Sequence, residues 1–227
     1  MLLAIDTSTS WASVALFDGR RVLGELTWHS ARRSGDELFP MLERLLAVGD
    51  TSLARVDRLA VATGPGSFTG IRVGIAAARG LARPTGATVT GVSTLDVIAF
   101  PHVAASRSVC ALLPAGRDDW YAARYEASDG VMVRRSPIEN GSLEELCASV
   151  AEPTLFTGEF DADVERRVRA LVGARAAFPP ASLRLRRAGH LADLAWRAIE
   201  AATAASAADL EPIYVKQASV GGAAGVA

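Results

Sequence analysis

Residues 64 to 70 hold three glycines and a proline within seven positions, and this segment constrains the fold more than any other. It follows an apolar run typical of a strand (Leu59 to Ala62) and precedes a run of small and apolar residues (Val73 to Ala82). Glycine tolerates positive φ and proline fixes φ, so the segment predicts a tight turn between a strand and a helix. Ser67 or Thr69 would cap that helix. Two interpretations follow: an anion site at a helix N-terminus, or a compact structural corner.

The bulk composition fits one large globular domain or two small ones. The chain has 227 residues, half of them hydrophobic, and a formal net charge of −1. This balance gives no electrostatic signal for direct binding of nucleic acid or of a membrane surface. Cys110 and Cys147 are too few for a disulfide scaffold, so we expect two small buried hydrophobic side chains. Met1 to Asp6 lacks the features of a signal peptide and no segment resembles a membrane span, which predicts a soluble, cytoplasmic protein.

The first hundred residues predict three consecutive strands followed by alternating helices and strands. The strands are expected over Leu2 to Asp6, Ser13 to Phe17 and Val22 to Trp28, with a hairpin turn at Asp18-Gly19. The later elements are expected as a helix over Asp36 to Val48, a strand over Val56 to Ala62, a helix over Thr69 to Ala82, a strand over Val89 to Val92 and a helix over Thr94 to Phe100.

After Pro101 the same order of elements begins again. Strands are expected over Val109 to Leu113, Trp120 to Glu126, Val131 to Arg134 and Thr154 to Phe156, and helices over Leu143 to Val150, Asp161 to Val172 and Ala188 to Ala205. Hairpins and crossovers together predict a mixed sheet covered by helices in each half. We therefore expect an N-terminal lobe (1–100), a C-terminal lobe (101–187), a segment packing back on both (188–216) and a flexible tail (217–227).

Several short segments resemble the TsaB family of glycoprotease-like proteins. The main matches are Leu3 to Thr9 and Thr63 to Arg72, and the shorter ones are Leu38 to Met41, Gly91 to Leu95, Arg117 to Tyr121 and Pro212 to Val215. The chain departs from the family pattern at Ser34, Pro114 and Gly116, which weakens any role for those positions. The resemblance implies an α/β fold of two ribonuclease-H-like lobes with mixed sheets, the architecture of actin, hexokinase and Hsp70.

The resemblance also implies a function. Members of the family are non-catalytic, activating subunits of the complex that transfers a threonylcarbamoyl group to the adenosine beside the anticodon of certain tRNAs. Such a subunit pairs with the catalytic subunit TsaD and supports binding of the ATPase TsaE. The resemblance therefore implies no cofactor on this chain, ATP and magnesium on its partners, a homodimer when it is alone, and contact with tRNA only through the complex.

Two other classes of function remain as alternatives, a small ATPase or phosphotransferase of the same fold and a tRNA-binding module. Asp6, Thr7 and Ser8 are the weak candidates for a nucleotide or magnesium site. A turn that approaches a phosphate closely needs glycine, whereas Thr7 to Thr9 carries side chains. We prefer a structural role in which Asp6 accepts hydrogen bonds from nearby turn amides.

Other catalytic chemistries find little support in the residues. A ribonuclease-H-like nuclease needs converging carboxylates, but the strand ending at Ala62 is followed by Thr63-Gly64. His29, His102 and His190 are far apart in the sequence and lack the helical spacing of paired metal ligands. Arg117 to Tyr121 is either a partner contact or, as we prefer, a solvated turn that enters a strand.

Two helices offer more apolar surface than one core face requires. In the first helix the apolar residues cover about half of the circumference, and in the second the small residues recur at spacings of three and four. The predicted partner interface consists of Leu38, Met41, Leu42, Leu45, Gly70, Ile71, Gly74, Ala77, Ala78 and Leu81. The alternative is that the small residues pack only on their own sheet. With this interface, the glycine segment is chiefly a corner that positions a helix, and only secondarily an anion site.

The start of the first helix has two solutions. Ser34 and Glu37 would form a capping box, but Pro40 would then fall inside the helix and remove one backbone hydrogen bond. A start near Leu38 places Pro40 in the first turn and avoids that penalty, so the sequence leaves both starts open.

Overall fold

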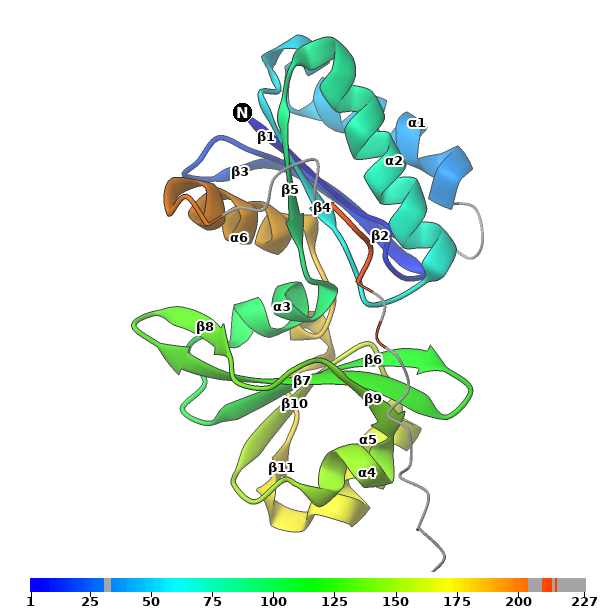
Figure 1. Cartoon of the computed structure of the whole chain (residues 1–227), viewed down its shortest axis with the longest axis vertical. Helices are drawn as coiled ribbons and strands as arrows, with labels where there is room; N and C mark the ends of the chain where they lie inside the picture. Colours follow the sequence, from blue (N-terminus) through cyan, green and yellow to red (C-terminus); the bar gives the residue numbers. More distant parts are fainter. Residues whose placement is uncertain (31–33, 204–209, 214, 216–227) are drawn as a thin grey trace, which may run out of the picture.

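The computed structural model describes residues 1–30, 34–203, 210–213 and 215. Within them the chain forms two α/β lobes, each built on one mixed β-sheet and stacked along the long axis of the molecule (Figure 1). The fold class predicted from the sequence is thereby confirmed. The predicted tail over 217–227, with Tyr214 and Lys216, lies outside the described residues.

The first lobe has a five-stranded sheet in the order β3-β2-β1-β4-β5. Its elements are β1 (Leu2–Asp6), β2 (Trp11–Phe17), β3 (Val22–His29), α1 (Ser34–Val48), η1 (Leu53–Arg55), β4 (Arg58–Ala62), α2 (Phe68–Thr85), β5 (Thr88–Val92), α3 (Thr94–Ala99) and η2 (Phe100–His102). Strand β2 pairs antiparallel with β1 and β3, whereas β1, β4 and β5 are parallel. Hairpin strands and crossover strands thus meet at β1.

The second lobe repeats this arrangement around β6. Its elements are β6 (Ser108–Gly116), β7 (Asp119–Ser128), β8 (Val131–Arg134), β9 (Glu139–Ser142), α4 (Leu143–Ala148), β10 (Thr154–Gly158), α5 (Ala162–Val172), η3 (Gly173–Arg175), β11 (Ala176–Ala177), η4 (Ala181–Leu183) and α6 (Ala188–Glu200). The strand order β11-β10-β6-β7-β8 mirrors that of the first lobe, and β9 is a third partner of β7, beside β6 and β8. The sequence did not predict β9 or β11, since both are short and lack a run of β-branched residues.

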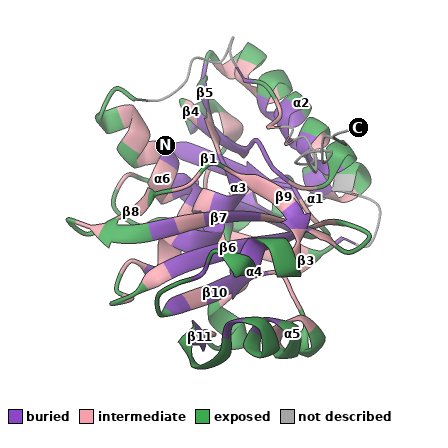
Figure 2. Ribbon diagram, turned by 60° about the horizontal axis from the view of Figure 1, so that its bottom comes forward, coloured by how far each residue is buried: buried purple, intermediate pink, exposed green. Residues whose placement is uncertain are grey.

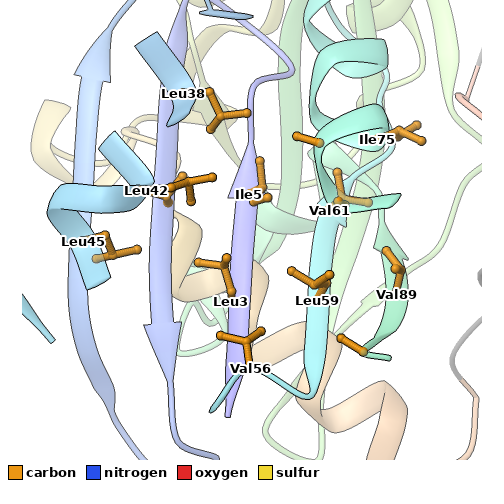
Figure 3. Close-up of a cluster of buried hydrophobic side chains, with 14 of the residues drawn as sticks. Leu3, Ile5, Leu38, Leu42, Leu45, Val56, Leu59, Val61, Ile75 and Val89 are labelled. Atoms are coloured by element: carbon orange, nitrogen blue, oxygen red, sulfur yellow. The ribbon is translucent and has the colours of Figure 1, made fainter. Parts of the chain in front are cut away.

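Each sheet buries both of its faces. Along β1, Leu3 and Ile5 point toward α1 and α2, while Leu2 and Ala4 point toward α6. Figure 3 shows the first of these cores, where leucines of α1 meet the strand residues. In the second lobe α4 and α5 cover the face that carries Leu112. The period of two in strand side chains produces this division.

The third helix of each lobe packs on the sheet of the other lobe. Leu95 and Ile98 of α3 join the core of β6 and β7, and Leu191 and Ala195 of α6 join the core of β1, β2 and β4. Figure 1 shows α3 and α6 between the two sheets. This exchange explains how residues far apart in the sequence come to share one junction between the lobes.

The bounds of α1 differ from the expectation. The helix begins at Ser34, two residues before the expected Asp36, so Pro40 lies inside it, which is the first of the two solutions. Proline in a helix interior removes one backbone hydrogen bond. Leu42 and Leu45, which are 4% and 0% exposed, pack into the core on the same helix. Burial of such side chains contributes about 1.5–3 kcal/mol each and offsets the lost bond.

Helix α6 is shorter than expected. It ends at Glu200, and residues 201–203 are not helical, whereas the predicted end at Ala205 lies outside the described residues. Helix α2 is longer than expected and runs to Thr85, with Gly86 in the left-handed region at its C-cap. Glycine adopts this conformation without a steric penalty, which fixes the end of the helix.

Both cysteines are free and buried, as predicted from their number. Burial raises the pKa of Cys110 to about 12 and that of Cys147 to about 11. They act as small hydrophobic side chains in the core between α4, which carries Cys147, and β6, which carries Cys110. Over the described ranges of the chain, none of the helices has the length and apolar character needed to cross a membrane.

Candidate functional site

The glycine segment between β4 and α2 packs directly on the turn that follows β1. Ser67 caps α2 by accepting a hydrogen bond from Gly70 N at 3.2 Å, and its own amide donates to Ser8 O at 2.7 Å. Thr7 Oγ1 donates to Gly70 O at 2.7 Å. A Cβ would lie 2.2 Å from Ser8 O if added to Gly66, and 2.0 Å from Thr7 O if added to Gly70. Glycine is therefore needed here for contact with the chain's own backbone, as in a structural corner.

Asp6 ends β1 and is fully buried. Its Oδ1 accepts hydrogen bonds from Ser8 N at 3.0 Å and from Ser8 Oγ at 2.7 Å. This is the turn-amide bond that the sequence favoured. Its Oδ2 accepts a hydrogen bond from Arg186 Nε at 2.5 Å, a partner 180 positions away that the sequence did not indicate.

Arg186 precedes α6, and 2% of its surface is exposed. Its terminal nitrogens donate to Glu159, to Thr9 Oγ1 at 3.1 Å and to Trp11 O at 2.6 Å. Burial opposes the charged form, but Asp6 and Glu159 outweigh burial and raise the pKa of Arg186. Asp6 belongs to the first lobe and Glu159 follows β10 in the second, so one guanidinium joins both lobes.

A cavity of about 870 Å³ lies beside this network, between the lobes. Residues of both lobes line it, including Trp11, His29, Trp120, Phe160 and Arg184. Its walls mix aromatic, aliphatic and charged side chains. Of its two carboxylates, Glu159 is paired with Arg186, and Asp161 accepts backbone hydrogen bonds at the start of α5.

The alternative of a nucleotide and magnesium between the lobes meets residues that do not fit these ligands. Arg186 engages the carboxylates of Asp6 and Glu159, so neither is free to bind a cation. The amides of Ser8 and Ser67, which would face a phosphate, are already hydrogen-bonded within the corner. Among the described residues, His, Cys, Asp and Glu side chains form no group of three that could hold a metal ion.

Two of the three histidines approach one another at the junction between the lobes, although they are far apart in the sequence. His102 Nε2 lies 2.8 Å from Thr157 Oγ1, and burial together with nearby His190 lowers the pKa of His102. Burial, with a smaller effect of Arg187, also lowers the pKa of His190. Exchange of α3 and α6 between the lobes brings them together, which no local pattern could reveal.

The segment Arg117 to Tyr121 forms the bend of the β6–β7 hairpin. Arg117 has φ of 53° and is exposed together with Asp118, while Trp120 is 8% exposed. This geometry matches the solvated turn that enters a strand with a packed aromatic side chain.

Helices α1 and α2 lie on the same face of the first sheet and leave an apolar groove between them (Figure 1). The groove has a volume of about 530 Å³. It is lined by Gly35, Phe39, Val73, Ala76, Ala77, Gly80 and Leu81. Phe39 is 52% exposed, and Phe68 at the start of α2 is 54% exposed. An apolar groove with an exposed aromatic side chain in its lining, such as Phe39, is a surface suited to a partner.

The structure divides the ten residues of the predicted interface. Most of them are buried in the chain's own core, namely Leu38, Leu42, Leu45, Gly70, Ile71, Gly74 and Ala78. The ridge of small residues thus packs on its own sheet, which was the alternative to a partner-facing ridge. Ala77 and Leu81 line the groove, and Met41 is half-buried.

The interface predicted from the sequence left out several residues of α2 that line the groove. Val73, Ala76 and Gly80 recur at spacings of three and four, a helical stripe next to the buried one. Both stripes contain small residues, so spacing alone did not show which one faces the sheet. That a partner covers this surface stays a prediction.

The chain is similar to a known protein family, to several characterised relatives and to solved structures. The model of the family described as "TsaD: tRNA N6-adenosine threonylcarbamoyltransferase" matches residues 27–147, more than half of the chain. The tRNA threonylcarbamoyladenosine biosynthesis protein TsaB of Escherichia coli is 37% identical over 131 residues, which are 56% of this chain and 56% of that protein. The match thus spans little more than half the length of that relative.

Two further similarities extend over more of the chain. The protein of the same name from Bacillus subtilis is 28% identical over 160 residues, 69% of this chain and 70% of that protein. The solved structure of YeaZ from Pseudomonas aeruginosa superposes with a TM-score of 0.79 and 31% identity, covering 94% of this chain and 99% of that one.

Proposed function

The chain belongs to the TsaB family, and on that premise we propose that it is a non-catalytic subunit in the biosynthesis of threonylcarbamoyladenosine in tRNA. In this proposal it pairs with the catalytic subunit TsaD, supports binding of the ATPase TsaE, and meets tRNA in the cytoplasm only through the complex. The names of the curated relatives favour this role over an independent ATPase or phosphotransferase.

The observation that carries the proposal is the apolar groove between α1 and α2. Its walls combine an exposed aromatic side chain, Phe39, with small residues such as Ala76 and Gly80 that let another helix approach closely. The TsaD family model matches residues 27–147, a range that contains both helices. A TsaD subunit would then present a similar helix pair, and the two grooves would meet as related surfaces.

The same surface supports self-association. An apolar helix face that meets a copy of itself under twofold symmetry forms a homodimer. We propose that this homodimer is the state of the chain without TsaD, and that the two assemblies compete for one groove.

The interlobe network supports the non-catalytic part of the proposal. A carboxylate that acts as a base or metal ligand needs a free oxygen, yet both oxygens of Asp6 are occupied within the protein. We therefore propose that this chain works without a resident cofactor and that ATP and magnesium belong to the partner subunits.

The proposal is tested by size-exclusion chromatography with light scattering on the chain, on TsaD, and on their mixture with TsaE and nucleotide. The matched variants are Ala76→Arg on α2 and Ala170→Arg on α5, both at exposed helix positions. We expect the wild-type chain and Ala170→Arg to form the mixed complex and Ala76→Arg to remain apart with an unchanged melting temperature. No wild-type complex, or full pairing by Ala76→Arg, would refute the proposal.

A further inference from the structure

Arg186 makes more hydrogen bonds than a single ion pair requires. It is buried between the lobes, and its guanidinium donates to two carboxylates, a hydroxyl and a carbonyl in two separate segments of the chain, residues 6–11 and Glu159. Arginine stays charged and presents its donors in a fixed plane, so the partners of Arg186 are held in one mutual geometry. The segment that Arg186 holds most directly is the end of β1.

The end of β1 is connected to the start of α2 through hydrogen bonds. Asp6 accepts from Arg186 with Oδ2 and from Ser8 with Oδ1. Ser8 O then accepts from Ser67 N at 2.7 Å, at the cap of α2. Thr7 Oγ1 donates to Gly70 O at 2.7 Å, inside the first turn of the same helix. A continuous chain of contacts thus leads from the interlobe arginine to the helix that forms one wall of the groove.

The contact between the turn and α2 leaves little freedom for α2 to shift. A Cβ on Gly74 would lie 2.6 Å from Thr7 Oγ1, so the helix axis is already as close to the turn as glycine allows. A displacement of the turn is therefore transmitted to α2, because packed elements move together. Val73, Ala76 and Gly80 follow on that helix and line the groove.

We propose that Arg186 is a positioning residue for the partner groove, and that it fixes the start of α2 through the Asp6 to Ser8 turn. This inference rests on the proposed function, since it concerns the surface assigned to TsaD. The cation is part of the chain, so the groove is preset without a bound ligand.

The experiment combines hydrogen exchange at the amides of residues 67–71 with the affinity for TsaD. Arg186→Met removes the charge and the donors at similar length. Thr7→Val removes only the bond to Gly70 O and keeps the side-chain volume. The matched control is Arg187→Met. Arg187 is the next residue in the chain, but its side chain is half-exposed and pairs with Glu25 on β3. Arg186 and Thr7 are both buried, and neither lines the groove.

We expect Arg186→Met to raise exchange at residues 67–71 and to weaken TsaD binding, each by on the order of tenfold. Thr7→Val should change both in the same direction by a few-fold, and Arg187→Met should change neither. If Arg186→Met does not fold, Thr7→Val decides alone. Unchanged exchange in a folded variant, or faster exchange with undiminished TsaD binding, would overturn the inference.

Failure of the proposed function gives a different result. If the wild-type chain does not bind TsaD, the partner assignment fails whatever the variants do. The exchange at residues 67–71 still shows whether Arg186 fixes the start of α2.

Discussion

Helices α1 and α2 of the first lobe and helices α4 and α5 of the second occupy equivalent places in two copies of one topology. Their outer surfaces are opposite in character. The first pair has 15 and 18 residues and exposes Phe39 and Ala76, whereas the second has 6 and 11 residues. Arg166 and Arg167 cover its outer surface and form ion pairs there, and α5 is exposed along that side (Figure 2). One topology therefore yields an apolar outer surface in the first lobe and a charged one in the second, according to which residues lie on the outer stripe.

The largest expected effect distinguishes the two stripes of α2. Gly74→Leu should destabilise the fold by about 3 kcal/mol, because overpacking in a tight core costs free energy and Thr7 and Val61 already surround this position. Chemical denaturation measures the free energy of unfolding. A variant as stable as the wild-type chain would show that α2 does not pack on its sheet through this stripe.

The next effect concerns the groove. Gly80→Leu should leave the fold intact, since nothing lies within 4 Å of a Cβ at this position. It should weaken binding of TsaD by about 2 kcal/mol, because the new side chain fills space where a partner helix would pack. Calorimetric titration against TsaD checks this value. Binding of wild-type strength by a folded variant would place the partner surface elsewhere.

A smaller effect is expected on the pH dependence of stability, through two histidines at the junction between the lobes. The pKa values of His102 and His190 are lowered in the folded chain, chiefly by burial. The unfolded chain therefore binds protons more readily, so stability is fully present above pH of about 6.5 and falls as the pH drops below it. The charged groups beside His190 are Arg187, Glu25 and Asp193.

Melting temperatures measured from pH 7.5 to 5.5 test this expectation. His102→Gln should lie on a shallower slope, because one of the two titrating groups is gone while a polar partner for Thr157 remains. An identical slope in the variant would remove His102 from the explanation.

The smallest effect is expected on the second helix pair. Arg166→Ala breaks an exposed ion pair with Asp163 one turn away on α5 and should change stability by less than about 0.5 kcal/mol. It should leave TsaD binding unchanged, as a surface that faces water requires. A loss of TsaD binding would mean that the second lobe also contacts the partner.

Much of the fold was predictable because its signals are local. The hairpin at Asp18-Gly19, the alternation along β1 and the glycine segment before α2 each depend on neighbouring residues, and each element formed as expected. The start of α1 stayed open in the sequence, because the local cost of Pro40 opposes a start at Ser34, whereas leucine burial over the whole helix decided the outcome.

The candidate site was less predictable, since its geometry depends on long-range contacts. Arg186 meets Asp6 across 180 positions, and His102 approaches His190 only because α3 and α6 exchange sheets. The helices that carry the groove were identified, and Ala77 and Leu81 of the predicted interface line it. The other predicted residues of α2, Gly70, Ile71, Gly74 and Ala78, are buried in the chain's own core. Gly74 and Gly80 look alike in the sequence, and only the sheet beneath α2 distinguishes them.

The sequence by itself determined the two-lobed topology, the position of the glycine corner and the pair of helices with surplus apolar surface, because periodicity and turn chemistry act over a few residues. Only the tertiary structure decided which stripe of α2 remains exposed and that Arg186 neutralises Asp6 between the lobes. The physical reason is that burial and charge pairing depend on which distant segments meet, and no local pattern encodes that meeting.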